Sequence, residues 1–348
     1  MLKSRARIKH SFKKIYIMDK EKTIHAYKGF DKDLKCRGFQ YEVGKEYKKD
    51  GEIGLCQNGF HACWFPFDVF SYYDPGNTNR YCAVTQSGVM RGALDDSKVA
   101  SQKIRIDSEI GVEGIVKAGI EFILDKVDFD GKENYDSEEC SVVANALAHS
   151  AATNIGRQSG ALESGDYSSA SCSGEYSAAV NVGDRSVASN TALNSVAANT
   201  GYYSAAINEG ECSAATNTGY YSAATNKGIY SVAVNSGNNS VALNSGLNAG
   251  SVNIGEDSAA TAVGDFSVAL NMGKQSIAKV SGKQSIAIVT GVCSKAAGAL
   301  GDWIVLTERG EWNGDTFSIK EVKAFKVDGK KIKADTFYKL VNGEAVEV

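Results

Sequence analysis

Residues 231–246 read SVAVNSGNNSVALNSG and hold almost two copies of a nine-residue unit that recurs from Ser141 to Asp302. The segment 141–302 divides into eighteen such units without insertion or deletion. The first position is Ser in seventeen units, the third is Ala in sixteen, the seventh is Gly in fifteen and the fifth is Asn in twelve. A short fixed period of this kind predicts a solenoid, in which each repeat stacks on its neighbours.

Each unit predicts one short strand followed by one turn. Side chains alternate in character along Ser231–Asn235, which is the period-two pattern of a strand, and Gly237 is expected to supply backbone freedom for the turn. Ser, Ala and Asn suit a narrow interior in which stacked coils bring like side chains about 4.8 Å apart, so that Asn amides can bond along the stack. Val, Leu and Ile then point outward. The alternative is the reverse orientation, with a flat Ser/Ala/Asn face outside.

The number of units per coil decides how many sides the solenoid has, and two units would give a two-sided coil. The sequence GYYSAA occurs at 201–206 and again at 219–224, an offset of two units that would stack Tyr202 on Tyr220 and Tyr203 on Tyr221. The recurrence of SVALN at 240 and 267, an offset of three units, leaves a three-sided coil open.

The outward positions of odd-numbered units are more apolar than those of even-numbered units. The odd-numbered set includes Val232, Val234, Val268, Leu270, Ile286 and Ile288. Even-numbered units carry pairs such as Ala259 with Thr261 and Ile277 with Lys279. A long apolar stripe on a thin solenoid is typical of an association surface, so we expect a homo-oligomer through the odd-numbered set, a trimer being one such state.

The units that begin at Ser231 and Ser240 resemble the Ser-Val-Ala-Ile-Gly repeats of trimeric autotransporter adhesin heads. The resemblance covers the repeat region only. This chain has nine residues per strand and turn rather than about seven, and Asn where those heads carry Gly. The resemblance implies a parallel β-roll that trimerises through outward apolar residues, and it implies nothing about adhesion.

Composition excludes several classes of function. The 348 residues carry a net charge of −3, so no bulk charge attracts nucleic acid. No apolar run reaches membrane length, and residues 1–14 are basic and polar without a signal-peptide core, which predicts the cytoplasm of the host cell or, for a phage structural part, the virion. Eight cysteines spread over a chain without a secretion signal indicate reduced thiols. No Cys-x-x-Cys pair is present, and we expect neither a metal nor a cofactor.

The predicted fold class is mainly β: a parallel β-solenoid of eighteen nine-residue repeats between two other domains. The predicted segments are a flexible basic arm at 1–14, an α+β head domain at 15–127, a linker at 128–140, the solenoid at 141–302 and an all-β cap at 303–348. One amphipathic helix in the head is expected to begin at Asp107 or Ser108 and to end at Leu124. The cap would close the last coil and protect its edge.

Three stretches of the head carry a second resemblance: HAYKGF at 25–30, CRGFQYEVGKEY at 36–47 and GFHAC at 59–63. They resemble an uncharacterised domain family found in phage and prophage genes, over most of residues 15–85. Chains of that family often continue into Ala/Ser/Asn-rich repeats. The resemblance implies a mobile-element origin and leaves the chemistry undefined.

Four head residues are candidate catalytic residues. His25, Tyr72, Tyr73 and Glu121 are the residue types with which ADP-ribosyltransferases hold NAD and polarise its ribose. Their spacing in the sequence does not establish a site.

Aromatic residues are candidate binding residues in two places. Trp64 and Phe65 indicate either core or a partner-binding surface of the head. The turn residues Tyr202, Tyr203, Tyr220 and Tyr221 indicate either a recognition stripe or stacking that shields the coil edges.

Together these patterns favour a non-enzymatic, oligomeric solenoid scaffold that presents the head to a host or phage protein. Such a protein would be a virion-associated part or an inhibitor of a host defence system. The alternative is an ADP-ribosyltransferase-like effector or toxin with the solenoid as a multimerising stalk. The four candidate catalytic residues around one pocket would favour the alternative.

Overall fold

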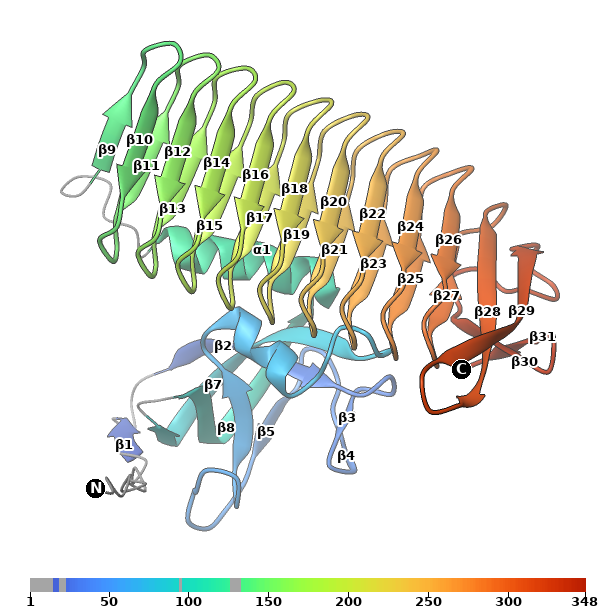
Figure 1. The fold of residues 1–348 in the computed structure, drawn as a ribbon. Helices are drawn as coiled ribbons and strands as arrows, with labels where there is room; N and C mark the ends of the chain where they lie inside the picture. Colours follow the sequence, from blue (N-terminus) through green and yellow to red (C-terminus); the bar gives the residue numbers. More distant parts are fainter. Residues whose placement is uncertain (1–14, 19–22, 94–95, 126–132) are drawn as a thin grey trace, which may run out of the picture.

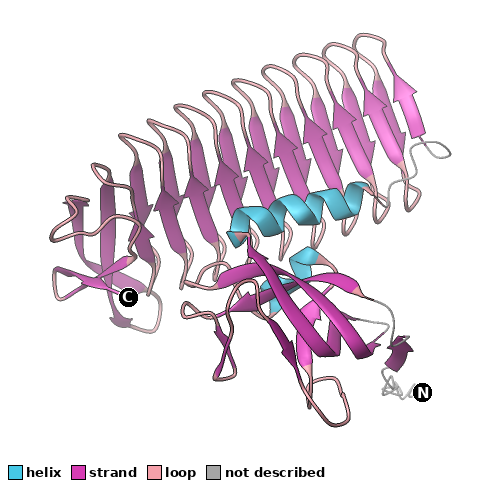
Figure 2. Ribbon diagram, turned by 180° about the vertical axis from the view of Figure 1, so that it is seen from behind, coloured by secondary structure: helices cyan, strands magenta, loops and turns pink. Residues whose placement is uncertain are grey.

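The computed structural model describes residues 15–18, 23–93, 96–125 and 133–348. A long solenoid crosses the molecule, the head lies along one side of it, and a small β region continues its C-terminal end (Figure 1). Seen from behind, helix α1 (Gly111–Leu124) runs along the solenoid next to the head sheet (Figure 2). The predicted fold class is confirmed. The predicted arm at 1–14 and residues 128–132 of the predicted linker lie outside the described residues.

The solenoid is a flattened coil of two parallel sheets, which we call the open sheet and the covered sheet because the head packs on the second. The repeat strands of the open sheet are β10 (Val142–Asn145), β12 (Gly160–Glu163), β14 (Ala178–Asn181), β16 (Val196–Asn199), β18 (Ala214–Asn217), β20 (Val232–Asn235), β22 (Gly250–Asn253), β24 (Val268–Asn271) and β26 (Ile286–Val289). Those of the covered sheet are β11 (Ala151–Asn154), β13 (Ser169–Cys172), β15 (Val187–Asn190), β17 (Ala205–Asn208), β19 (Ala223–Asn226), β21 (Val241–Asn244), β23 (Ala259–Ala262), β25 (Ile277–Val280) and β27 (Lys295–Ala297).

Strands two units apart pair in register. Val232, for example, pairs with Ala214 on one side and with Gly250 on the other. The coil therefore has two units and two sides, and the three-sided alternative is wrong. Strand β9 (Glu133–Asp136) adds in parallel to β11, so the covered sheet begins within the segment predicted as a linker.

Ser, Ala and Asn side chains fill the interior, so the reverse orientation of the repeat is wrong. Each Ser joins successive coils. The Ser240 N–H donates to Ser258 Oγ at 3.0 Å, and the Ser240 hydroxyl donates to the Gly219 carbonyl at 3.2 Å. Repeated along the rod, these bonds satisfy polar groups that the narrow interior would otherwise bury without partners.

Asn at the fifth position connects the two sheets within a turn of the coil. The Asn235 Nδ2 group donates to the carbonyls of Ser222 at 3.4 Å and Val241 at 3.2 Å, which belong to the two flanking units. Asn235 Oδ1 accepts a hydrogen bond from the Gly237 N–H at 2.8 Å. The asparagines of successive coils do pair in register, but the expected hydrogen bonds between their amides are wrong, because each amide bonds to backbone groups instead.

Gly at the seventh position is favoured by close packing and not by a left-handed turn. Gly237 has no positive φ, but a Cβ there would lie 1.9 Å from the Gly219 carbonyl oxygen of the preceding coil. The left-handed residue stands at the ninth position, as at Asn239, where φ is 53°. Leu147 replaces Gly in the first unit, where the described part of the chain has no strand before β10 in its sheet. Ala192 is the exception in an internal coil.

The head is a six-stranded antiparallel sheet with one covering helix, in the strand order β1-β7-β2-β6-β8-β5. Its elements are β1 (Ile15–Met18), β2 (Ile24–Phe30), β3 (Lys35–Cys36), β4 (Phe39–Gln40), β5 (Glu46–Lys48), β6 (Phe60–Cys63), the 3-10 helix η1 (Pro66–Ser71), β7 (Arg80–Ala93), β8 (Asp96–Glu109) and α1. The predicted helix start is wrong, because β8 continues through Glu109 and Gly111 has a φ of 63°. Asp107 and Ser108 are strand residues.

The head packs on the outer face of the covered sheet. One hydrophobic cluster contains Phe65 and Ile115 from the head together with Val187 and Val241 from the sheet, and helix α1 contacts β15. Burial of this apolar area, rather than the chain connection alone, holds the two domains together.

Ninth-position residues also meet the head along one turn edge. The Arg185 guanidinium carbon lies 5.3 Å from the ring centroid of Tyr203 and 5.7 Å from that of Phe65 in the head. Asp257 stands at the same repeat position four coils further on, and its carbonyl accepts a hydrogen bond from the Gly76 N–H at 3.1 Å. A Cβ at Gly76 would lie 2.4 Å from the Asp257 carbonyl carbon, so only glycine fits at this contact.

The C-terminal region extends both sheets. Strand β28 (Trp303–Trp312) pairs in parallel with β26, and β29 (Phe317–Lys326) pairs antiparallel with β28. Strand β30 (Tyr338–Val341) pairs antiparallel with β27 and with β31 (Glu344–Glu347). These strands cover the backbone edges that the last coil would otherwise expose.

The Gly237→Ala variant tests the close packing of coils. We expect it to lower the free energy of unfolding by about 2 kcal/mol, because the added methyl group meets a backbone carbonyl. Gly250→Ala is the matched control: there the added Cβ has Val232 Cγ2 as its nearest neighbour, at 3.8 Å, so this variant should be neutral or slightly stabilised. Urea unfolding followed by circular dichroism checks both. Equal effects of the two substitutions would contradict the packing argument.

A buried carboxyl group interrupts the row of fifth-position asparagines. Glu163 is 1% exposed, and its Oε1 lies 3.2 Å from Ser150 Oγ. Burial raises the pKa of Glu163 from 4.5 to about 7, although hydrogen bonds from Ser150 and the Gly165 backbone act in the opposite direction. Folding therefore favours the protonated carboxyl. Its contribution to stability is complete below pH 4.5 and is lost as the pH rises through about 7.

The Glu163→Asn variant should gain stability over the natural chain as the pH rises. Asn fits the repeat and has no proton to lose, so we expect the difference in unfolding free energy to grow by roughly 2–3 kcal/mol between about pH 4.5 and about pH 8. Urea midpoints at the two pH values measure it. Glu211→Gln, at an exposed turn position, should show no such growth. A constant difference for Glu163→Asn would refute the assignment.

Candidate functional site

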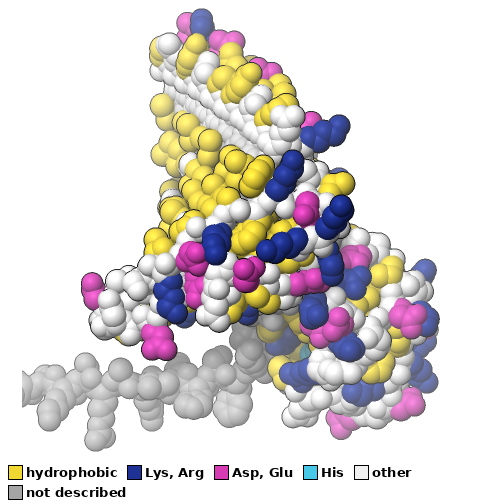
Figure 3. Space-filling model, turned by 90° about the vertical axis from the view of Figure 1, so that its right-hand side faces the viewer, with side chains coloured by type: hydrophobic (Ala, Val, Ile, Leu, Met, Phe, Trp, Pro, Cys, Tyr) yellow, Lys and Arg dark blue, Asp and Glu magenta, His cyan; other side chains and the backbone are white. Residues whose placement is uncertain are grey.

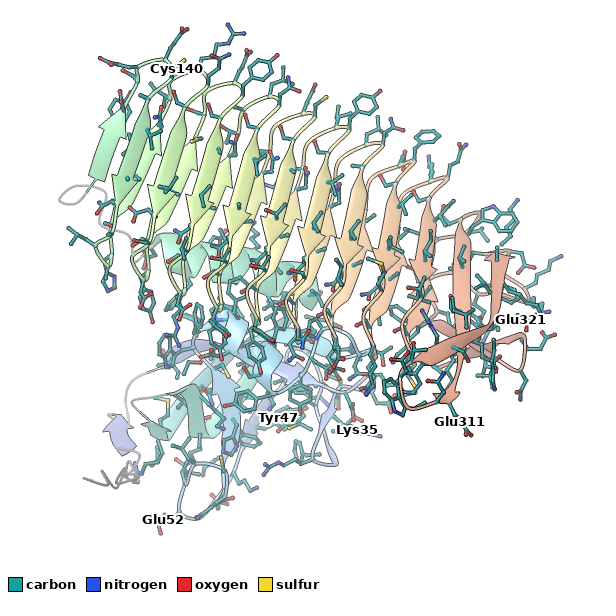
Figure 4. All side chains as sticks on the ribbon, viewed as in Figure 1. Lys35, Tyr47, Glu52, Cys140, Glu311 and Glu321 are labelled. Atoms are coloured by element: carbon teal, nitrogen blue, oxygen red, sulfur yellow. The ribbon has the colours of Figure 1, made fainter. Side chains whose placement is uncertain are left out.

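A cavity of about 500 Å³ lies in the head. Strands β2 and β6 contribute its base, and residues from the β3–β4 hairpin, β5 and the segment after η1 contribute its walls. Tyr47, one of the wall residues, is labelled in the head in Figure 4, far from Cys140 at the opposite turn edge of the solenoid.

Lys28 is the buried cation of this cavity. Strand β2 alternates so that Ala26, Lys28 and Phe30 are all buried, and Lys28 is only 5% exposed. The Lys28 ammonium donates to the His61 carbonyl at 2.9 Å and to Cys36 Sγ at 3.5 Å. Burial lowers the pKa of Lys28, while the neighbouring Cys36 opposes that shift. The cavity therefore contains an amine with depressed basicity.

Two tyrosine hydroxyls near Lys28 stay protonated. Gly29 lets the Tyr73 ring lie directly against β2, because a Cβ there would come within 2.5 Å of Tyr73 Cβ. Burial raises the pKa of Tyr73, and its contact with Cys36 adds to the shift. Burial also raises the pKa of Tyr41, whose ring centroid lies 5.8 Å from Lys28 Nζ. Both hydroxyls can donate hydrogen bonds at neutral pH.

His61 is a structural residue of the cavity wall. Its Nε2 accepts a hydrogen bond from the Cys56 N–H at 3.0 Å, and it also bonds to the Gly59 backbone. Burial, followed by the charge of Lys28, lowers the pKa of His61 to about 4, so the ring is neutral at pH 7. Cysteines line the same cavity, but the described residues contain no group of three or more His, Cys, Asp or Glu arranged to hold a metal ion.

The structure does not bring the four candidate catalytic residues together. Tyr72 and Tyr73 line the cavity, whereas His25 and Glu121 do not. His25 is exposed on β2, and Glu121 is exposed on α1, 3.9 Å from Lys117. The cavity residues that sequence reasoning missed are Lys28, Tyr41 and their neighbours. A lysine at an inward position of an alternating strand was the available signal.

The predicted aromatic binding residues fall into two groups. Tyr203 stacks on Tyr221 at 5.1 Å and lies 6.3 Å from the ring of Phe65, which is 1% exposed. Tyr203 and Tyr221 therefore face the chain's own head. Within the head, Trp64 is half-buried against Phe122. Tyr202 stacks on Tyr220 at 5.5 Å. This second pair stays 49% and 43% exposed and is open to a partner.

The predicted oligomer residues all lie on the outer face of the open sheet. Their exposed fractions are 38% for Val232, 38% for Val268 and 36% for Ile286, and Val234, Leu270 and Ile288 are partly exposed between them. Hydrophobic side chains run in rows along the solenoid in the space-filling view (Figure 3).

Comparison with protein families places the cavity within a known domain. Residues 24–118 match a domain of unknown function, DUF7666. The match extends from β2 into α1 and contains every residue that lines the cavity.

No curated protein and no solved structure matches the chain. The comparisons therefore give no support to the phage and adhesin resemblances. No helix among the described residues combines the length and the apolar character needed to cross a membrane.

Proposed function

We propose that this protein is a β-solenoid scaffold that assembles with a second copy of itself through the open sheet. The observation that carries the proposal is an uncovered apolar face on a molecule whose other broad face is already covered by its own head. Of the eighteen outward positions in the nine repeat strands of the open sheet, Thr216 is the only polar one and none is charged.

The covered sheet differs in composition. Its outward positions include Ser169, Ser171, Lys279 and Lys295. The more polar face is thus covered within the chain, while the more apolar face is left to solvent in a single copy. Contiguous apolar patches larger than a few hundred Å² are rare on monomers and mark sites of association.

The dimensions of the open sheet suit a two-fold pair. Nine strands about 4.8 Å apart, each with four residues rising about 3.3 Å, give a face roughly 40 Å long and roughly 13 Å wide. Two such faces in contact would bury roughly 1,000 Å² or more, where specific interfaces begin. An isologous dimer would bury this one flat face of each copy against the same face of the other copy. The trimer implied by the adhesin resemblance is the other outcome of a mass measurement.

In the proposed assembly the head domains lie on the outer sides. Each head would be available to a protein partner, together with the exposed pair Tyr202 and Tyr220 beside it. We propose a phage or host protein as that partner, and a role either as a virion-associated part or as an inhibitor of a host defence system. A non-enzymatic role is favoured because His25 and Glu121 lie outside the cavity.

Solution mass tests the assembly. We expect the full chain to be a dimer or trimer by light scattering, and the double variant Val232→Lys, Val268→Lys to be monomeric with an unchanged circular dichroism spectrum. Two lysines per copy would bring like charges into an apolar contact, where they lose hydration without gaining partners.

Leu193→Lys is the matched control. Leu193 is 38% exposed, like Val232, and lies in the turn after β15 of the covered sheet, so this variant should keep the mass of the natural chain. A monomeric natural chain, or a double variant that keeps the oligomeric mass, would refute the proposal.

A further inference from the structure

We propose that the cavity of the head binds a nucleotide, with Lys28 and Arg37 at the phosphate and the aromatic walls around the base. The site lies within a single head, so the inference is independent of self-association. It depends on three features of the cavity: its charge, the donors of its buried lysine and its exposed rings.

The charge of the lining has one sign. Five of the lining residues are cationic, namely Lys28, Arg37, Lys48, Lys49 and Lys98, and none of the lining residues is an Asp or Glu. Arg37 and Lys49 are exposed and have no ion-pair partner among the described ranges of the chain. On a protein with a net charge of −3, this concentration of positive charge is local and favours an anion in the cavity.

Lys28 offers a buried donor to that anion. An ammonium group has three N–H donors, and the protein supplies two acceptors, the His61 carbonyl and Cys36 Sγ. The remaining donor belongs to a side chain that lines the cavity and is 5% exposed. A phosphate oxygen would complete its hydrogen bonds and would compensate the cost of burying the charge.

Aromatic rings at the cavity select a ligand that also has a flat ring. Phe39 is 46% exposed and is held edge-on by Tyr41 at 4.8 Å and by Tyr47 at 5.4 Å. Tyr72 is also 46% exposed. Bare phosphate would not use these rings, and an uncharged apolar ligand would not use the cations. Nucleotide bases stack on exposed aromatic rings of this kind.

The size of the cavity agrees with this class of ligand. Its volume of about 500 Å³ lies within the range of small-molecule sites, about 300–1,000 Å³. The protonated hydroxyls of Tyr41 and Tyr73 add hydrogen-bond donors for phosphate or ribose oxygens.

Isothermal titration calorimetry of the full chain tests the site with ADP, GDP and UDP, with the matching nucleosides adenosine, guanosine and uridine, and with inorganic phosphate. We expect at least one nucleoside diphosphate to bind with a Kd below about 1 mM. Its own nucleoside and phosphate should each bind at least tenfold more weakly than that nucleotide, because each lacks one of the two recognised groups.

Two variants locate the binding in the cavity. Lys28→Met removes the buried cation, and Arg37→Gln removes an exposed one whose loss should not affect folding; each should weaken the nucleotide at least tenfold. Lys32→Gln changes an exposed cation outside the cavity and should bind like the natural chain. The inference is overturned by absence of binding for all three nucleotides, by equal binding of the matching nucleoside, or by nucleotide binding that survives Arg37→Gln unchanged.

Discussion

Successive coils of the solenoid approach so closely at the seventh repeat position that the backbone of one coil occupies the space of a side chain on the next. The backbone ladders hold the coils at this stacking distance, which also allows the hydrogen bonds from serine to the coils on either side. The interior of so thin a coil is filled mainly by Ser, Ala and Asn, with a few larger side chains such as Val280 and Val289 near its C-terminal end. Most of the larger apolar side chains of the repeat therefore point outward, which is the reverse of the usual arrangement of a globular core.

Because apolar side chains point outward, both broad faces of the solenoid expose apolar surface. The head of the same chain covers one of these faces. The head places Phe65, Phe67 and Ile115 on the covered sheet and closes the turn edge through Arg185. The open sheet keeps the same geometry with still fewer polar groups. The architecture thus derives from a single constraint in the interior, which dictates both the internal docking of the head and the proposed pairing of two copies.

The repeat was predictable because its period, its small inward residues and its two-unit coil are properties of neighbouring units. Contacts between distant segments were not predictable from the sequence. The sequence left open whether Phe65 and Tyr203 pack within the protein or bind a partner. They contact each other because the head packs on the solenoid, which the sequence does not reveal. The cavity was missed for the same reason, since Lys28 and His61 become neighbours through the strand order of the head sheet. The role of Gly237 was misjudged because a turn glycine and a close-contact glycine look alike in a sequence.

Two of the contacts between the head and the turn edge, at Arg185 and at Asp257, are separated by four coils of the solenoid. The head therefore bridges a fixed number of coils. Repeat proteins change length easily by duplicating or losing units, since each unit contacts only its neighbours. Here one coil added or removed between Arg185 and Asp257 would shift one contact by about 4.8 Å relative to the other. The length of the rod is consequently free to vary only outside this interval, and within it the number of coils is fixed by the size of the head.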